Sequence, residues 1–425
     1  MIKHRAYETL ERLAFERVTG GEKEREAAQL LMDECKKMNV EVHTESYTIP
    51  APEVTKVSFE VLEPEHQVIY CTGIGKTGET PEEGITAELV YIHDGEEEDI
   101  QDVKGKIVLS TNGMKADLRK KLVEKGALGY VTSWGGYYDD EIMQEQVPHR
   151  FARLEKDDTS NFPGVMMNLN TIKKLLHSHP KKVKMVLQQD ATKTLESQNV
   201  VATIKGSEKP EEVVLFSAHY DSVEFSSGAW DNGSGDVTIL EICHYFVENP
   251  PKRTVKFVWC GSEEIGLVGS KSYCEQHKDE LKDIILNVNF DMTGCLMAKN
   301  FVFGSCDKSI IDRVVFSGKI KGIHFGSKIG LMPSDSTSFA LNGVPAMSFG
   351  TMTPRGGAEI HSRRDSMDNM DADELDKICE FVCGFADEIV NAVINVVPRE
   401  LPKECEQQKE EMMKSLGFEI EKKEK

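Results

Sequence analysis

The sequence predicts an α/β protein with a mixed, mostly parallel sheet flanked by helices, into which a smaller β-rich α/β domain is inserted. From about Asn199 onward, continuous apolar strand segments alternate with helical segments, a pattern typical of a sheet covered by helices on both faces. Between residues 50 and 190 the pattern changes to short strands with few helices, starting at Pro50-Ala51-Pro52. This change of character predicts a second domain.

The N-terminal segment belongs with the later α/β region. Residues 5–39 have helical periodicity and residues 40–49 alternate like a strand. These elements are too few to bury a core of their own, so we assign them to the α/β domain. We therefore expect an α/β domain of residues 1–52 and 193–400, an inserted domain of residues 53–192, and a charged tail at 401–425.

The remaining elements follow in chain order. In the inserted domain we expect strands at 57–62, 88–92, 106–109, 128–132 and 183–187, and helices at 117–125 and 171–177. In the α/β domain we expect strands at 200–204, 213–216, 255–259, 284–290 and 344–349, and helices at 237–247, 268–276, 310–317 and 372–394.

The composition narrows the classes of partner. Lys and Arg number 51 against 72 Asp and Glu, a net charge of −21, which argues against nucleic acid and anionic membranes as partners. The first residues lack the apolar stretch of a signal peptide, and no apolar run is long enough to span a bilayer. Ten cysteines without a CxxC pair indicate reduced thiols. We expect a cytoplasmic protein whose oligomeric state the sequence leaves open.

Metal-ligating side chains follow one predicted strand after another. Because the carboxyl ends of parallel strands meet at one edge of a sheet, these side chains are expected to converge. A two-metal site needs a bridging carboxylate, with an imidazole and a carboxylate completing each half. The set that meets this requirement is His219, Asp231, Glu264, Asp291 and His361. Glu263 is not needed as a ligand and directly precedes the ligand Glu264. Its carboxylate can therefore take the proton of a metal-activated water.

Each of these residues has an ordinary explanation when it is taken alone. Asp231-Asn232-Gly233 is a common turn sequence, and a single histidine is more often a polar surface or core residue than a metal ligand. Asp221 and Asp365 could each be helix or loop caps. The ordered series of strand ends favours the metal site over this combination of coincidences.

The motifs also resemble a known family, the co-catalytic di-zinc aminopeptidases. The resemblance covers about residues 1–50 and 195–395, and the motifs keep the family's order. They are HYDS (219–222), WDNGSG (230–235), GSEEIGLVGS (261–270), NFDMTG (289–294) and the late His361. The resemblance implies a zinc-exopeptidase (phosphorylase/hydrolase-like) fold, two Zn²⁺ per subunit and peptide substrates.

The resemblance also implies a role for each site residue. His219 and Asp291 would hold one zinc, Glu264 and His361 the other, Asp231 would bridge them, and Glu263 would be the general acid/base. Asp221 resembles the acid that orients the ring of His219. The Asp231–Asn232 bond is a candidate for the family's cis peptide.

The substrate side is less defined by the resemblance. Ser334-Asp335-Ser336 resembles the family's SD motif near the substrate pocket, and we place Asp335, Met292 and Ile360 beside the substrate. Ile360 stands where many members have a tyrosine that helps to hold the oxyanion. This departure leaves metal binding intact but makes the substrate and the rate uncertain.

The inserted domain resembles the protease-associated domain. VKGKIVL (103–109) and GALGYV (126–131) match its two apolar motifs on either side of a helix. The resemblance implies that this domain limits access to the site or contributes to substrate selection.

The sequence therefore predicts a zinc-dependent exopeptidase, foremost an aminopeptidase that hydrolyses N-terminal residues from peptides with a metal-activated water. A carboxypeptidase or another amidohydrolase on the same fold is the first alternative. A glutaminyl cyclase, which uses one zinc, and a non-catalytic receptor-like binding module are further alternatives. The complete set of five ligands and Glu263 argues against both of these.

Overall fold

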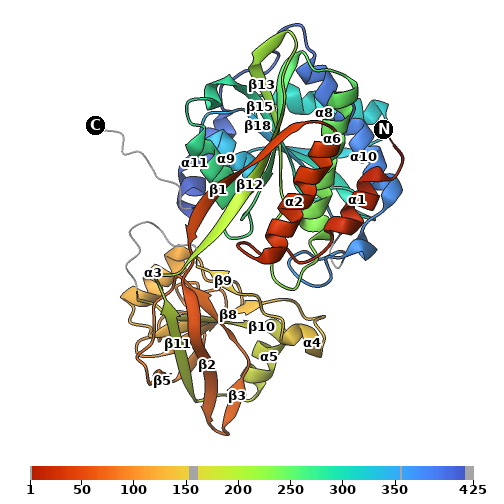
Figure 1. Ribbon diagram of the computed structural model, residues 1–425. Coiled ribbons are helices and arrows are strands. Elements are labelled where there is room, and N and C mark those ends of the chain that lie inside the picture. Colours follow the sequence, from red (N-terminus) through yellow and green to blue (C-terminus); the bar gives the residue numbers. More distant parts are fainter. Residues whose placement is uncertain (1, 153–160, 355–356, 417–425) are drawn as a thin grey trace, which may run out of the picture. The chain divides into compact units, whose positions relative to one another are not determined.

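The computed structural model describes residues 2–152, 161–354 and 357–416 (Figure 1). The described chain divides into two compact units, residues 1–49 with 196–416 and residues 50–195. The chain enters and leaves the second unit through two long strands, β1 (Glu41–Pro50) and β12 (Thr194–Ile204). Among the described helices, none combines the length and apolar content needed to cross a membrane.

The first unit is built on an eight-stranded sheet with the order β1-β12-β14-β13-β15-β18-β16-β17. Four neighbouring strands at its centre, β14, β13, β15 and β18, run parallel. β12 is antiparallel to β14, and β16 is antiparallel to β18. This sheet has the mixed, mostly parallel class that the sequence predicts. The bounds are β13 (Lys209–His219), β14 (Arg253–Cys260), β15 (Ile284–Phe290), β16 (Lys299–Ser305), β17 (Phe325–Ile329) and β18 (Ala346–Met352).

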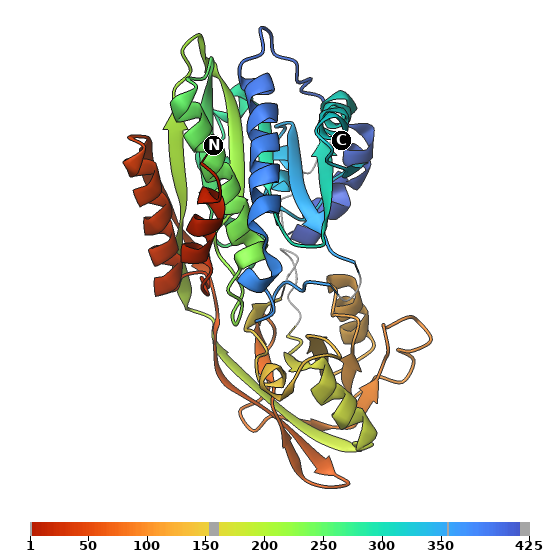
Figure 2. The same cartoon turned by 90° about the vertical axis from the view of Figure 1, so that its right-hand side faces the viewer.

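Helices cover both faces of this sheet. α1, α2, α6 and α10 lie together on one side, and α9 and α11 lie on the other (Figures 1 and 2). Large apolar side chains fill the space between the layers, such as Trp259 and the stacked rings of Phe290 and Phe349. Each such side chain contributes roughly 1.5–3 kcal/mol by leaving water. The bounds are α1 (Arg5–Leu13), α2 (Glu22–Lys37), α6 (Ser234–Glu248), α7 (Val268–Gln276), α8 (Lys308–Ile320), α9 (Asp335–Leu341), α10 (Ala372–Val390) and α11 (Lys403–Leu416).

The second unit holds two sheets of its own. A six-stranded sheet has the order β6-β7-β8-β10-β4-β9, and a four-stranded sheet has the order β3-β2-β11-β5. Their apolar inner faces share one core, which includes Phe59, Leu109, Val131 and Met185. The strands are β2 (Glu53–Glu63), β3 (Gln67–Ile69), β4 (Thr72–Gly75), β5 (Ile85–Ala87), β6 (Leu89–Tyr91), β7 (Ile107–Ser110), β8 (Gly129–Trp134), β9 (Arg150–Phe151), β10 (Gly164–Asn168) and β11 (Lys182–Asp190); the helices are α3 (Ala116–Glu124), α4 (Glu141–Gln144) and α5 (Leu169–His177).

Several elements differ from the sequence-based expectation. The helical segment 5–39 is two helices separated by residues 14–21, where Gly20 has a positive φ of 75°. The last long helix ends at Val390, four residues before the expected end at Ile394. Residues 403–416, expected within a charged tail, form α11, which buries Cys405 and Leu416. The backbone N–H of Leu331 donates to the side-chain oxygen of Gln408 in this helix, so α11 is attached to the α/β unit.

Candidate active site

The predicted ligands lie at the carboxyl ends of the central parallel strands. His219 is the last residue of β13, Glu264 follows β14, and Asp291 follows β15 directly. His361 lies in the loop after β18, and Asp231 lies just before α6. Because these strands are parallel neighbours, their ends share one edge of the sheet, which brings together residues from five separate segments.

Asp231 stands at the centre of this cluster. Its Oδ1 lies 3.2 Å from Nε2 of His219, whereas its Oδ2 lies 3.1 Å from Nε2 of His361. Asp291 Oδ1 completes the first half at 3.8 Å from His219 Nε2, and Glu264 Oε2 completes the second at 3.2 Å from His361 Nε2. In each half, one ligand atom from each of the three residues lies within 4.8 Å of the other two. The cluster therefore consists of two three-residue groups that share one carboxylate.

The electrostatics of the cluster favour positive charge at this place. Burial lowers the pKa of His219, but the carboxylates of Glu263, Asp221, Asp231 and Asp291 outweigh burial and raise its pKa well above the usual range. For His361, Glu264 and Asp231 likewise outweigh burial and raise the pKa to about 10. A divalent cation satisfies the same carboxylates, and imidazole with carboxylate is a donor set that zinc takes. The residues present therefore fit a metal site.

Asp221 holds the Glu263-Glu264 segment in place. Its Oδ1 accepts a hydrogen bond from the backbone N–H of Glu263 at 2.9 Å, and its Oδ2 accepts one from that of Glu264 at 3.2 Å. Its Oδ1 also lies 3.5 Å from Nδ1 of His219, the contact that the family resemblance implies. This buried carboxylate thus touches parts of both halves of the cluster.

Asp365 performs the corresponding task for the bridging residue. Its Oδ1 accepts from the N–H of Trp230 at 2.8 Å and its Oδ2 from the N–H of Asp231 at 3.0 Å. From the sequence, Asp365 is expected only to cap a helix or a loop. Asp221 and Asp365 form a matched arrangement, because each buried carboxylate binds two successive N–H groups of a ligand-bearing segment.

The backbone around the cluster has unusual conformations. The Asp231–Asn232 peptide is cis, as the family resemblance predicts. Ser262, Met292 and His361 have φ values of 59°, 69° and 60°, which residues other than glycine rarely adopt. Each costs of order 1–3 kcal/mol, and such positions concentrate at functional sites.

Comparison with known proteins finds a similar family. The sequence description of peptidase family M28 matches residues 199–386, which include all five predicted ligands. This part of the α/β domain is therefore similar in sequence to peptidase family M28.

The curated relatives of this chain include both an aminopeptidase and a carboxypeptidase. Aminopeptidase YwaD of Bacillus subtilis (strain 168) is 28% identical over 300 residues, 69% of this chain. Carboxypeptidase Q of Homo sapiens is 28% identical over 325 residues, 72% of this chain and 68% of the relative. The match spans less than two thirds of YwaD, 62% of its length.

Solved structures share the fold of the whole chain. A zinc aminopeptidase from Bacillus subtilis, BSAP, has a TM-score of 0.77 at 22% identity and covers 95% of this chain and 99% of its own. An aminopeptidase from Aneurinibacillus sp. strain AM-1 has a TM-score of 0.70 at 24% identity, with coverage of 93% and 96%. These similarities support the zinc-exopeptidase fold that the sequence predicts.

The predicted substrate residues of the α/β domain occupy different environments. Met292 and Ile360 are half-buried and pack against the edge of the core, beside the ligands Asp291 and His361. Asp335 begins α9 and is only 1% exposed, so its carboxylate lies inside the protein rather than on a surface that a peptide can reach. Its place beside the substrate stays a prediction.

Glu263 has the environment of a proton carrier. Its side chain is half-buried, and its carboxylate forms no hydrogen bond or ion pair with the described residues. Burial, with contributions from Glu264, Asp335 and Asp291, raises the pKa of Glu263 well above its usual range. A carboxylate with a raised pKa, adjacent to the ligands, is suited to accept a proton and pass it on.

Proposed function

We propose that this protein is a zinc-dependent aminopeptidase that removes N-terminal residues from peptides by means of a metal-activated water. The observation that carries the proposal is the geometry of Asp231, whose two oxygens each contact one imidazole-carboxylate group. This arrangement supports two Zn²⁺ per subunit: one held by His219, Asp231 and Asp291, and one by Asp231, Glu264 and His361. The similarity of residues 199–386 to peptidase family M28 supports peptide hydrolysis as the reaction.

The residues of the site divide the chemistry between them. Two zinc ions, when bound, lower the pKa of a water molecule and polarise the scissile carbonyl. Glu263 takes the proton of the attacking water and delivers it to the departing amine, a transfer that its raised pKa favours. Asp221 holds the backbone of Glu263 in place through its N–H. Asp365 keeps Asp231 oriented in the same way.

The acidic character of the site supports preference for a free α-amine over a free carboxylate. Glu263 and Asp291 lie close enough to influence each other's charge, so a cationic amine is stabilised there and an anionic terminus is repelled. A carboxypeptidase or another amidohydrolase remains the second candidate because carboxypeptidase Q is among the relatives. Half-buried Met292 and Ile360 support a side chain of apolar character at the first substrate position.

Two further properties belong to the same proposal. We propose that residues 50–195 are a protease-associated domain, which the strand–helix–strand unit β7, α3 and β8 supports. We also propose that the enzyme works in the cytoplasm, which its ten cysteines, all buried and unpaired, support.

One experiment separates the candidate functions. Metal content is measured in protein purified without chelator, and hydrolysis is measured with matched peptides that carry either a free or an acetylated N-terminus. Close to two zinc ions per chain with strong preference for the free amine is the expected result. Preference for acetylated peptides would favour the carboxypeptidase or amidohydrolase, and a protein that binds no zinc would favour a binding module.

A further inference from the structure

Arg17 lies between α1 and α2, outside the residues that the M28 family description matches, and its side chain is fully buried. Within the described structure, every hydrogen bond donated by its guanidinium goes to a backbone carbonyl. The acceptors are the carbonyls of Tyr220 (2.6 Å), Leu13 (2.5 Å), Phe15 (2.8 Å), Ser227 (2.7 Å) and Gly228 (3.0 Å). A buried arginine that binds only carbonyls fixes the path of the backbone around it.

Three of these carbonyls belong to one segment, residues 220–228, which we call the ligand loop. The ligand loop begins directly after His219 and ends three residues before Asp231. Arg17 Nε binds its first carbonyl, at Tyr220, while the two Nη atoms bind its last two, at Ser227 and Gly228. Because the five N–H groups of a guanidinium have a rigid planar geometry, the side chain fixes the distance between the two ends of the loop.

Other contacts join residues 17–19 to the ligand loop. Ser222 donates its N–H to the Arg17 carbonyl at 3.1 Å, and the Arg17 N–H donates to Ser222 Oγ at 2.9 Å. Thr19 Oγ1 donates to Asp221 Oδ2 at 3.2 Å, the oxygen that also binds the N–H of Glu264. Residues 17–19 therefore run alongside the start of the ligand loop and reach the carboxylate that holds the Glu263-Glu264 segment.

The fit at the far end of the loop is tight. Gly228 has a φ of 57°, and a Cβ at this position would lie 2.8 Å from Arg17 Nη2. Only glycine combines this backbone conformation with the close approach of the guanidinium.

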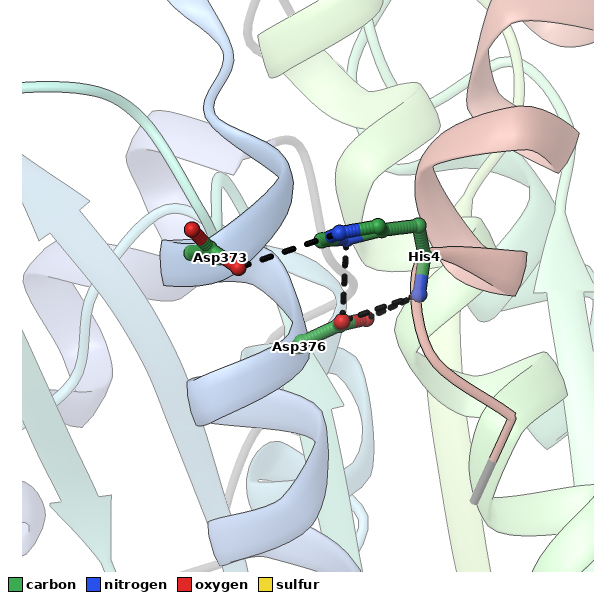
Figure 3. Close-up of side chains that lie close together, drawn as sticks. All are labelled: His4, Asp373 and Asp376. Carbon is green, nitrogen blue, oxygen red and sulfur yellow. Dashed lines mark hydrogen bonds and ion pairs between the residues drawn. The ribbon is translucent and has the colours of Figure 1, made fainter.

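The N-terminal segment that carries Arg17 is itself anchored. Figure 3 shows His4 against the first turn of α10, where Asp376 accepts from the His4 N–H at 3.1 and 2.9 Å and lies 3.1 Å from Nδ1. Arg5 forms a bidentate pair with buried Glu241 of α6, at 2.7 and 2.6 Å. The cluster of His4, Asp373 and Asp376 thus attaches α1 to the unit.

Electrostatics also connect Arg17 with the metal centre. Burial lowers the pKa of the guanidinium, whereas the nearby carboxylates of Asp236, Asp365, Asp221 and Asp231 act in the opposite direction. Arg17 therefore offsets part of the negative charge of the cluster without forming an ion pair with any ligand.

We propose that Arg17 is a positioning residue of the metal centre, which sets the separation of His219 and Asp231 by closing the ligand loop around its guanidinium. This inference rests on the proposed zinc site. It extends the site to a part of the chain that the family motifs do not include.

The test compares two buried arginines. Arg253 is also fully buried and binds the carbonyls of Val390 and Ala392, but it lies at the start of β14, at the opposite end from Glu264. The full-length variants Arg17→Lys and Arg253→Lys both keep the charge and lose the planar fork. Zinc affinity is measured by competition with a chromogenic chelator, and unfolding of the zinc-free proteins is followed by circular dichroism.

Arg17→Lys is expected to lower zinc affinity by about 10–100-fold, a range typical for groups that orient metal ligands, with activity regained at high zinc. Arg253→Lys is expected to lower the melting temperature while zinc affinity stays unchanged. Equal zinc affinities in parent and Arg17→Lys would overturn the inference, and a parent that binds no zinc would instead overturn the proposed function. If Arg17→Lys fails to fold, Gly228→Ala decides, because its Cβ would lie 2.8 Å from Arg17 Nη2 and displace the guanidinium: unchanged zinc affinity there rejects the inference.

Discussion

Asp365→Asn tests whether a buried carboxylate acts on the metal centre or only on the fold. The side chain accepts the N–H groups of Trp230 and Asp231, at 2.8 and 3.0 Å, and it is fully buried. Asparagine has nearly the same shape, but it offers one acceptor oxygen and turns an NH₂ group toward the second N–H. We expect Asp231 to lose its fixed orientation.

The magnitude follows from the lost contact. A hydrogen bond to a charged acceptor contributes about 1.5–3 kcal/mol. If that energy serves to orient Asp231, its loss corresponds to about a 10- to 150-fold weaker affinity for zinc, at about 1.4 kcal/mol per tenfold change.

The substitution should destabilise the zinc-free protein less than the zinc-loaded protein. Burial, followed by the nearby charge of Asp231, raises the pKa of Asp365 to about 7, so its ionised form is costly in the zinc-free protein. In the zinc-free protein, removing that buried charge offsets part of the stability lost with the hydrogen bond. The destabilisation of the zinc-loaded protein should therefore exceed that of the zinc-free protein.

The assay is denaturant unfolding of parent and variant, with and without zinc, together with chelator competition. Asp371→Asn is the matched control, because Asp371 caps α10 by accepting a single N–H from Glu374 at 2.9 Å, away from the ligands. We expect this control to change stability little, and equally in both states, because asparagine caps a helix about as well as aspartate does. An equal loss for Asp365→Asn with and without zinc, at unchanged zinc affinity, would refute the positioning role.

Further predictions concern the reaction, the metal and the fold. Glu263→Gln should keep both zinc ions by metal analysis while kcat falls by about 10²–10⁴, and a variant that retains activity would contradict the assigned proton transfer. Removing metal with a chelator should lower the melting temperature, and added zinc should restore it; a melting curve indifferent to zinc would argue against a resident metal. Burial raises the pKa of Glu24 from 4.5 to about 8, so the folded protein retains a proton that the unfolded chain releases, and stability falls between these pH values by at most roughly 4–5 kcal/mol. Unfolding over a pH series should show a steeper fall of stability in the parent than in Glu24→Gln; identical slopes would contradict the assignment.

The strands that carry the ligands could be predicted because their sequences are mostly apolar. Residues 284–290 and their parallel neighbours are buried on both faces, and this burial leaves a clear signal in the sequence. β17, by contrast, is a short strand at the edge of the sheet, and its polar, exposed residues Ser327 and Lys328 interrupt any apolar run, so the sequence does not predict it. α9 was also not predicted, because its polar sequence DSTSFAL is buried through side-chain hydrogen bonds such as Ser270–Ser338.

The sequence by itself determined the residue types of the site, since each strand end carries an imidazole or a carboxylate in a fixed order. Only the tertiary structure decided how those residues are held. Asp365 binds an N–H group 135 residues away, and Arg17 binds a carbonyl 203 residues away. Hydrogen bonds over such separations leave no local periodicity, because their partners meet only after the sheet and its covering helices have formed. The positioning of the metal centre is therefore a property of the packed fold.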